Sequence, residues 1–397
     1  MPRNPTLAAS EPHPALIVES PHAWDQVWQR PHHLVSRLAR WAETLYVSPR
    51  YLRDAFRSWL RKSRASSGKS VEGVCVARPL QIHGEALSPI LRWNQRQVLD
   101  ACAAFVKSHQ PSASQGLVVW IYDPHKYYLA NAYPDAFVVY DVMDEYSAFP
   151  WAPPDIKEEE RELLKRADLV IAGTWTLYDA KRSRTSRPCH AYPSAVEAER
   201  FMRPAHRPPA PAELVPLRMR YKALLGYVGT IDMRLDAECL SATMARHPEW
   251  GLALIGPVRG DFPSLRRLEN CHFLGPKPYV ELPPYLWNFN VALVPFVDSE
   301  LTRHVNPTKV LEYFAAGLPV VARALPEMVR CYKETAVLYT NTRDFENKLI
   351  ETVRRGDADP RIMLGAEKAR AYSWEKVASE IWQKVTEGLE KRNAARR

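Results

Sequence analysis

Asn306-Pro-Thr-Lys-Val-Leu-Glu-Tyr-Phe-Ala-Ala-Gly-Leu-Pro-Val-Val321 predicts one helix, one turn and the start of a buried strand. Asn306 is expected to cap the helix, with Pro307 at its first position. Gly317 is expected to end it, because glycine readily adopts the left-handed conformation found there. A short apolar strand is expected from Val320. The apolar face has helical spacing and comprises Val310, Leu311, Phe314 and Ala315.

Two charged side chains, Lys309 and Glu312, lie three residues apart near the start of this helix. A helix N-terminus attracts anions, and a lysine in the first turn adds a full positive charge for a diphosphate. A carboxylate one turn later can accept hydrogen bonds from both hydroxyls of a ribose. The spacing alone fits a nucleotide-sugar site and, equally, a surface helix with an ordinary Lys–Glu pair.

The pattern Asn-Pro-Thr-Lys-x-x-Glu-Tyr-x-Ala-x-Gly-x-Pro-Val-Val resembles the donor-site signature of GT-B glycosyltransferases of the glycosyl transferases group 1 type. It is most similar to bacterial enzymes of surface-polysaccharide biosynthesis, in the teichuronic-acid transferase branch. The resemblance implies that Lys309 binds the donor diphosphate and Glu312 the ribose. It also implies two facing Rossmann-like domains, with a C-terminal helix that crosses back to the first. His304 departs from the pattern, since many relatives carry a glutamate there.

Length and composition are those of a globular protein with two domains. The chain has 397 residues, of which 46% are hydrophobic and 25% charged. No apolar run approaches the roughly 20 residues of a membrane span, and residues 1–14 lack the apolar core of a signal peptide. The six cysteines are scattered without a Cys-x-x-Cys pair, which argues against a zinc site or a disulfide framework. We therefore expect a cytoplasmic protein.

The formal net charge of +9 raises the question of an anionic partner. Nucleic acid is not favoured, because aromatic residues are not interleaved with the basic runs. Residues 50–64 combine helically spaced aromatic and leucine side chains with six basic residues and one acidic residue. This pattern indicates either an interfacial helix on anionic lipid, which would make the protein peripheral to the inner face of the cell membrane, or an amphipathic helix packed on its own domain.

Strands alternating with helices predict a parallel sheet in each half of the chain. The first half is expected to have strands at 15–20, 44–47, 74–77, 117–122, 137–140 and 169–173. The proline-rich stretch 203–211 cannot continue a helix or a central strand, so we expect it to link two domains. These are an acceptor domain over 1–205, with 375–397 packed back on it, and a donor domain over 206–374.

The loop after the first strand resembles the Gln-Arg-Pro-His segment near the N-terminus of the same transferases. By that resemblance Gln29, Arg30, His32 and His33 would lie on the acceptor side of the cleft, although each also suits a helix cap or a surface contact.

In the second half, small residues at Gly229 and Thr230 follow a strand, where they would let a phosphate approach the backbone. Arg234 suits the same diphosphate, or a pairing with Asp232 or Asp236. The expected nucleotide-sugar site comprises Gly229, Thr230, Arg234, Lys277, His304, Asn306, Thr308, Lys309 and Glu312.

An inverting transferase needs a base for the acceptor hydroxyl. Asp141, Asp144 and Glu145 follow an apolar strand, and their mutual repulsion is expected to raise the pKa of at least one. Asp144 is the first candidate, then Asp141, then His125 at the preceding strand exit; each also suits helix capping. No Asp-x-Asp pair with metal spacing follows a strand, so we expect a metal-independent enzyme whose only small-molecule requirement is the donor.

The leading hypothesis is a hexosyltransferase-like enzyme that moves a sugar from a nucleotide-diphosphate sugar to a polysaccharide or lipid-linked saccharide. A sugar-nucleotide epimerase on the same fold and a non-catalytic sugar-nucleotide-binding protein are the alternatives. A hydrolase of the Gly-x-Ser-x-Gly type is not supported, because the motif is absent.

Overall fold

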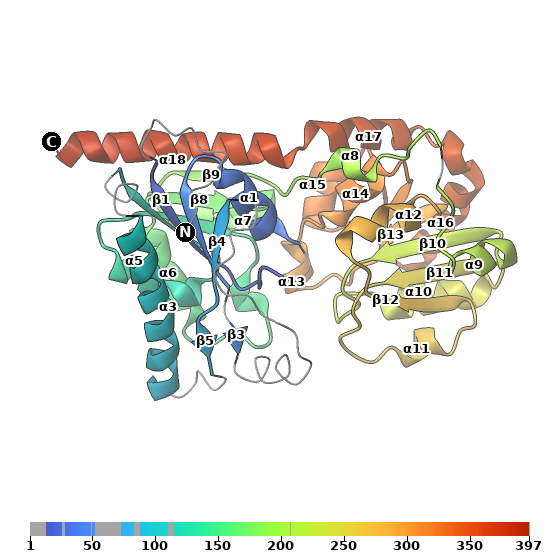
Figure 1. The fold of residues 1–397 in the computed structure, drawn as a ribbon. Coiled ribbons are helices and arrows are strands. Elements are labelled where there is room, and N and C mark those ends of the chain that lie inside the picture. The colour runs from blue at the N-terminus through green and yellow to red at the C-terminus, as the bar shows by residue number, and fades with distance from the viewer. Residues whose placement is uncertain are drawn as a thin grey trace. The chain divides into compact units, whose positions relative to one another are not determined.

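The computed structural model describes residues 13–25, 28–48, 50–51, 73–82, 88–109, 115–206 and 208–396. The chain forms two compact α/β units (Figure 1). The first unit comprises Met1–Pro193 and Trp374–Arg397, and the second comprises Ser194–Ser373.

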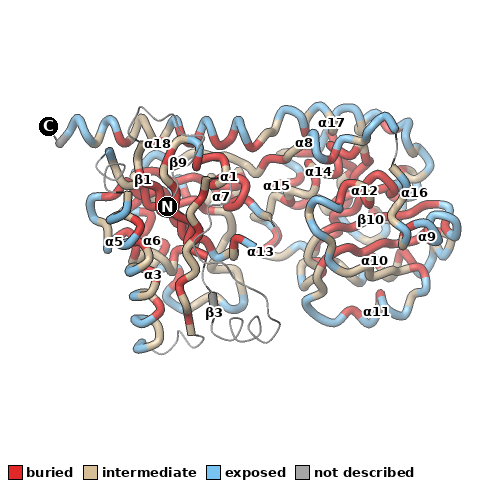
Figure 2. The backbone as a smooth tube through the Cα atoms, in the orientation of Figure 1, coloured by how far each residue is buried: buried red, intermediate tan, exposed pale blue. Residues whose placement is uncertain are grey.

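The first unit is built on a parallel sheet whose strand order is β4-β2-β1-β6-β7-β8-β9. Every residue of β1, β7 and β8 is buried, as is every residue of β6 after Leu117, and these strands are largely red in Figure 2. Since successive side chains of a strand point to opposite faces, burial of all of them means that both faces are covered. The strands are β1 (Ala15–Glu19), β2 (Glu43–Val47), β4 (Val74–Ala77), β6 (Leu117–Ile121), β7 (Phe137–Val142), β8 (Leu169–Ala172) and β9 (Cys189–Ala191).

The long C-terminal helix α18 (Trp374–Arg396) belongs to the first unit, as the sequence resemblance implied. It packs on α1 (Arg30–Leu38), which Figure 1 shows beside it. The rings of Trp374 and His33 stack with centroids 5.0 Å apart, and Arg37 Nη2 pairs with Glu375 at 2.7 Å. The other helices described in this unit are α3 (Ser88–Ser108), η1 (Pro124–Lys126), α5 (Tyr128–Ala132), η2 (Tyr146–Ala148), α6 (Ile156–Arg166) and α7 (Trp175–Arg182).

The second unit has its own parallel sheet, in the order β12-β11-β10-β13-β14-β15. Its strands are β10 (Ala223–Val228), β11 (Trp250–Ile255), β12 (Cys271–Gly275), β13 (Val291–Val294), β14 (Val320–Arg323) and β15 (Val337–Tyr339). Its described helices are α8 (Ala198–Phe201), α9 (Val215–Arg220), α10 (Ala237–Arg246), α11 (Pro263–Arg266), η3 (Tyr279–Glu281), α12 (Leu282–Leu286), α13 (Glu300–Arg303), α14 (Lys309–Ala315), α15 (Pro326–Tyr332), α16 (Thr342–Arg355), η4 (Gly356–Ala358) and α17 (Arg361–Ala371).

The proline-rich stretch 203–211 lies inside the second unit rather than between the two. The residues before it already belong to the second core. Val196 donates its backbone N–H to Tyr372 (3.0 Å), and Phe201 is fully buried, with its carbonyl accepting from Trp287 Nε1 at 2.7 Å. Proline content correctly indicated irregular backbone there, but these apolar anchors place the division between residues 193 and 194.

Helix α14 begins at Lys309, later than the caps predicted from the sequence. Thr308 is its N-cap residue, and the predicted cap, Asn306, instead accepts a hydrogen bond from the Tyr332 hydroxyl at 2.9 Å. The predicted end is confirmed: Gly317 has φ 71°, and its N–H donates to the carbonyl of Phe314 at 3.0 Å.

Of the expected basic helix at 50–64, only Arg50–Tyr51 is described, as the short strand β3 paired with β5 (Leu80–Gln81). Residues 52–64 lie outside the described residues. None of the helices in the described ranges is both long enough and apolar enough to cross a membrane.

Candidate donor and acceptor sites

The start of α14 meets the carboxyl end of β10 at a glycine. Gly229 has φ 134°, and a Cβ atom there would lie 2.4 Å from Lys309 Nζ. Gly256, at the end of the neighbouring strand β11, has φ 144°, and a Cβ atom on it would lie 2.0 Å from the Gly229 carbonyl oxygen. Both positions therefore require glycine, and together they leave the backbone of β10 open to close approach.

The Lys309 ammonium has an unusual environment. Nζ lies 4.0 Å from the ring centroid of Tyr227 and 5.3 Å from that of Phe296. Within the described part of the chain it forms no hydrogen bond or ion pair. Burial, together with the positive charge of Arg234, lowers the pKa of Lys309 to about 7. Glu312 and Asp232 attract this cation without forming an ion pair with it, and its closest contacts in the described chain are aromatic faces, so an anionic ligand would stabilise it.

Glu312 lies one turn after Lys309 and is partly buried. Burial raises its pKa to about 7, against the attraction of Lys309. The Tyr279 hydroxyl, from η3, hydrogen-bonds to this carboxyl group. Sequence reasoning missed Tyr279. The one indication in the sequence was its position, two residues after Lys277 in the loop that follows a strand.

Two of the predicted cations are paired with carboxylates in this structure. Arg234 donates to Asp232 from Nε at 2.9 Å and from Nη2 at 2.6 Å, the alternative that the sequence left open. Lys277 Nζ lies 2.6 Å from Glu213. Arg234 nonetheless remains close enough to Lys309 to lower its pKa, so two positive charges share this end of the sheet.

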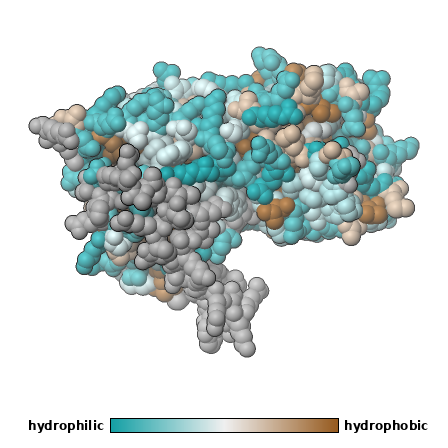
Figure 3. Space-filling view, turned by 45° about the horizontal axis from the view of Figure 1, so that its top comes forward, coloured by the Kyte–Doolittle hydropathy of each residue, from teal (hydrophilic) through white to brown (hydrophobic). Residues whose placement is uncertain are grey.

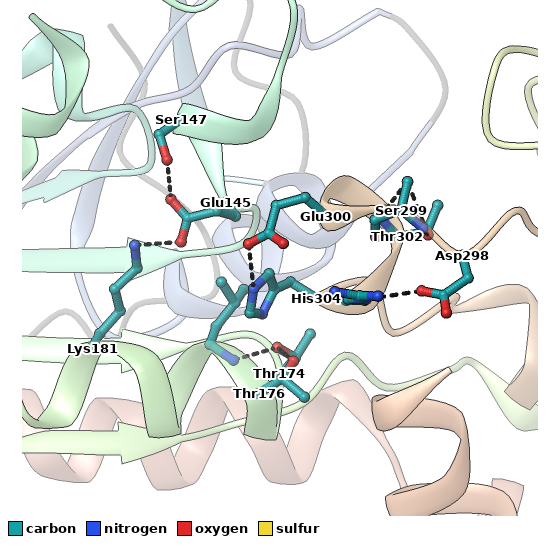
Figure 4. A network of polar contacts seen from close by, with 12 residues as sticks. Glu145, Ser147, Thr174, Thr176, Lys181, Asp298, Ser299, Glu300, Thr302 and His304 are labelled. Atoms are coloured by element: carbon teal, nitrogen blue, oxygen red, sulfur yellow. Dashed lines mark hydrogen bonds and ion pairs between the residues drawn. The ribbon is translucent and has the colours of Figure 1, made fainter. Parts of the chain in front are cut away.

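Three other residues were predicted for the donor site: Thr230, His304 and Thr308. In the described part of the chain they share no hydrogen bond or ion pair with one another or with Lys309. Thr230 accepts a hydrogen bond from the Tyr227 hydroxyl through its carbonyl (2.8 Å), and the Thr308 side chain makes no capping bond. His304 ends α13, with Nε2 3.8 Å from Glu300 (Figure 4). Its Nδ1 is buried without a hydrogen-bond partner among the described residues.

In the first unit, the residues at the start of α1 have internal partners. Gln29 caps the helix, with its N–H donating to His32 Nδ1 at 3.1 Å, and His32 Nε2 donates to the Ala23 carbonyl at 3.0 Å. Arg30 Nε donates to Asp141 at 2.9 Å, and its Nη1 donates to the Tyr192 carbonyl at 2.7 Å. Gln29, Arg30 and His32 therefore make helix-capping and core contacts; capping was the alternative to an acceptor-side role in the sequence analysis.

Asp141 lies within β7 and is fully buried. Its pKa is raised, as the sequence anticipated for one member of the acidic cluster, but the cause differs. Burial is the largest contribution, opposed by Arg30, and repulsion from neighbouring acids is not among the main causes. Glu145 is also engaged: Lys181 Nζ donates to it at 2.7 Å and Ser147 Oγ at 2.8 Å (Figure 4).

Asp144 is half-buried and lies near a tyrosine that sequence reasoning missed. The Tyr146 hydroxyl is buried and has no hydrogen-bond partner within the described ranges. Burial raises its pKa, and the nearby charges of Asp123, Asp144 and Glu19 raise it further. These carboxylates follow or end strands β6, β7 and β1, so the carboxyl edge of the first sheet carries a negative cluster around Tyr146. No group of His, Cys, Asp or Glu in the described residues is arranged to hold a metal ion.

His125, at the exit of β6, is paired with an acid. Its Nδ1 lies 2.9 Å from Glu159, and this hydrogen bond raises its pKa. A more basic imidazole is protonated over more of the neutral range, which makes His125 a weaker candidate for a general base at neutral pH.

Comparison with protein families gives a match within the second unit. Its residues 223–355 match the model described as Glycosyl transferases group 1. The match contains β10, Gly229, Lys309 and Glu312 and ends at the last residue of α16.

A curated relative from Bacillus subtilis is named as a teichuronic acid biosynthesis glycosyltransferase, TuaH. It is 27% identical over 241 residues, which is 56% of this chain and 60% of the relative. The chain thus matches less than two thirds of that protein's length.

Solved structures show that the fold extends over nearly the whole chain. Sucrose-phosphate synthase from Thermosynechococcus elongatus covers 94% of this chain and 99% of its own, with a TM-score of 0.73 and 17% identity. HepE from Anabaena, solved in complex with UDP and glucose, covers 94% of this chain and 100% of its own, with a TM-score of 0.69 and 13% identity. The fold of this chain is therefore GT-B, with two Rossmann-like sheets, as the sequence indicated.

Proposed function

We propose that this protein is a glycosyltransferase that moves a sugar from a nucleoside-diphosphate sugar to a saccharide or lipid-linked saccharide acceptor in surface-polysaccharide biosynthesis. The observation that carries the proposal is Lys309, a cation without an anionic partner in the described chain, against Gly229 and within a group 1 glycosyltransferase segment. The wider biosynthetic role is supported by the similarity to TuaH.

In the proposed reaction Lys309 binds the diphosphate, and Gly229 and Thr230 let the phosphate oxygens reach the backbone. Arg234 supplies a second positive charge as the diphosphate leaves, by exchanging Asp232 for phosphate oxygens. Charge neutralisation of the leaving group is the largest contribution that an enzyme of this type makes to the rate. Two protein cations at one site are suited to a metal-independent mechanism.

Glu312 accepts hydrogen bonds from the ribose hydroxyls in this proposal, and Tyr279 orients its carboxylate. UDP is the first nucleotide to test, because HepE was solved with UDP.

Asp144 is the proposed general base. Of the three candidates, Asp141 is fully buried against Arg30 and His125 is made more basic by Glu159, whereas Asp144 is half-buried at the exit of β7, close enough to Tyr146 to raise the pKa of its hydroxyl. A carboxylate there can accept the proton of an acceptor hydroxyl as the glycosidic bond forms.

The test is to incubate the purified protein with uridine, guanosine and thymidine diphosphate sugars and follow the release of nucleoside diphosphate. The proposal predicts release that rises on addition of a saccharide acceptor. Interconversion of the donor sugar without acceptor would instead identify an epimerase, and binding without any turnover would identify a non-catalytic protein.

A further inference from the structure

The loop after β7 carries an aromatic pair that the proposed reaction does not use. Trp151 has 72% of its surface exposed, and its ring packs on that of Phe149 with centroids 4.6 Å apart. The backbone between them closes a turn in which Ala152 N–H donates to the Phe149 carbonyl at 3.0 Å. Pro150, Pro153 and Pro154 restrict this backbone further. Trp151 therefore presents a flat aromatic face on a stiff support.

Exposure alone does not mark a binding site. On the face drawn in Figure 3, the apolar surface of the described residues forms small, separate patches, as on most protein surfaces. Trp151 differs in its neighbours, since the same loop carries Asp144 and the Tyr146 hydroxyl, which is buried and has no hydrogen-bond partner in the described ranges. In open parallel sheets, ligands bind at loops that leave the carboxyl ends of the strands.

The charges around this loop restrict what the tryptophan can bind. The charges of Glu19, Asp123 and Asp144 all act on Tyr146, and Lys126, whose Nζ lies 4.0 Å from Glu19, offsets one of them, so the charge there is negative overall. The acids in the first turn of α6 add little to it, because Glu158 pairs with Arg161 and Glu159 with His125. This negative potential disfavours anionic lipid and anionic sugars. A neutral sugar ring suits the site better: its C–H face is weakly positive and complements an aromatic face, and its hydroxyls are donors for carboxylates.

We propose that Trp151 is the stacking platform for a neutral sugar ring of the acceptor, with the Tyr146 hydroxyl and the Asp144 carboxylate as its hydrogen-bonding groups. This inference rests on the proposed transferase function and assigns the acceptor class at one subsite.

The test is saturation-transfer NMR on the full chain. The probes are methyl β-glycosides of glucose, galactose and N-acetylglucosamine, with methyl β-glucuronide as the anionic comparison. At least one neutral glycoside should bind saturably and more tightly than the glucuronide. Trp151→Ala should weaken it by about three- to tenfold, the worth of an aromatic stacking contact, and Trp151→Phe should restore part of the loss. The matched control is Trp93→Ala, which removes a 37% exposed tryptophan of α3 and should change nothing.

Equal binding of the neutral glycosides to wild type and Trp151→Ala, or tighter binding of the glucuronide, would overturn the inference. So would a selective loss of binding to phosphatidylglycerol vesicles in Trp151→Ala, which would assign the tryptophan to lipid. UDP binding, measured on the same samples by calorimetry, separates the two proposals. If UDP does not bind to wild type, the proposed donor site is wrong, whatever the glycosides show. If UDP binds and Trp151→Ala leaves glycoside binding unchanged, only the proposed acceptor platform is wrong.

Discussion

At the residue scale, the donor site depends on one lysine whose charge is costly in the free protein. Lys309 is held by Tyr227 and Phe296 rather than by a carboxylate, and its pKa is about 7. A diphosphate would return the ammonium to an environment that favours the charged form, and so raise the pKa towards its ordinary value of 10.5.

Donor binding is therefore expected to take up a proton. Affinity for UDP should fall as pH rises from about 7 towards about 10, because the free protein must first be protonated at Lys309. Calorimetry in buffers with different ionisation enthalpies measures the uptake directly. Lys309→Met keeps the side-chain length without the charge and should abolish the uptake. A wild-type binding enthalpy that is independent of the buffer at pH 8 would contradict the expectation.

Substitution of Asp144 tests the proposed deprotonation of the acceptor hydroxyl. Asp144→Asn keeps the size of the side chain and removes the base, so turnover should fall by about 100-fold or more while UDP affinity stays unchanged. The matched control is Asp135→Asn, which changes an exposed acid just before the same strand, β7. Near-normal turnover of Asp144→Asn with an intact fold would place the base elsewhere and leave Asp144 a capping residue.

At the element scale, α14 shows what local sequence determines. Gly317 predicted the end of the helix, because a left-handed residue is a backbone requirement that only a few residues meet. The start was predicted too early, because Asn306 bonds to Tyr332 from α15, a partner that no spacing reveals. Tyr279 and Tyr146 were missed for the same reason: Tyr279 meets Glu312, and Tyr146 meets Asp123 and Glu19, only in the folded chain.

The exit of β7 is held by a buried ionic network. Lys181 of α7 is fully buried and pairs with Glu145 at 2.7 Å and with Glu160 of α6 at 2.7 Å, and Tyr140 donates to Glu160 at 2.9 Å. Figure 4 shows Lys181 directed at Glu145. Because Glu145 adjoins Asp144, this network fixes the loop that carries the proposed base.

Lys181→Met should lower the free energy of unfolding by about 3–5 kcal/mol, since it removes the buried cation that Glu145 and Glu160 share and leaves Glu160 with Arg184, at 2.9 Å, as its remaining cation. Urea unfolding of the full chain measures the change. Lys157→Met, on the exposed side of α6, is the control and should cost little. A loss below about 1 kcal/mol for Lys181→Met would mean that the carboxylates find other partners or become protonated.

At the scale of the whole molecule, alternating apolar strands and helices were enough to predict two parallel sheets, because both faces of such sheets are buried and the strands read as continuous apolar runs. The division between the units was not predictable from composition. It depends on Val196 and Phe201, two ordinary apolar residues whose tertiary contacts assign residues 194–202 to the second core.

Peripheral attachment to anionic membrane remains a prediction for the basic stretch at 50–64, residues 52–64 of which lie outside the described residues. Replacing Arg53, Arg57 and Arg61 by serine should weaken binding to phosphatidylglycerol vesicles by about two decades, at roughly 1 kcal/mol per basic residue. The matched control replaces Arg266, Arg267 and Arg330 of the second unit. Equal vesicle sedimentation of wild type and the 53/57/61 variant would favour a helix packed on its own domain.

The central claim is that Lys309 binds the diphosphate of a nucleotide-sugar donor, and calorimetric titration of UDP tests it most directly. Wild type should bind UDP. Lys309→Ala should bind it more weakly by about 2–3 kcal/mol, or roughly 30- to 150-fold, the scale of a lost charge-assisted contact. Lys222→Ala, before β10, should bind as wild type does. Equal UDP affinity of wild type and Lys309→Ala, with both folded, would contradict the account.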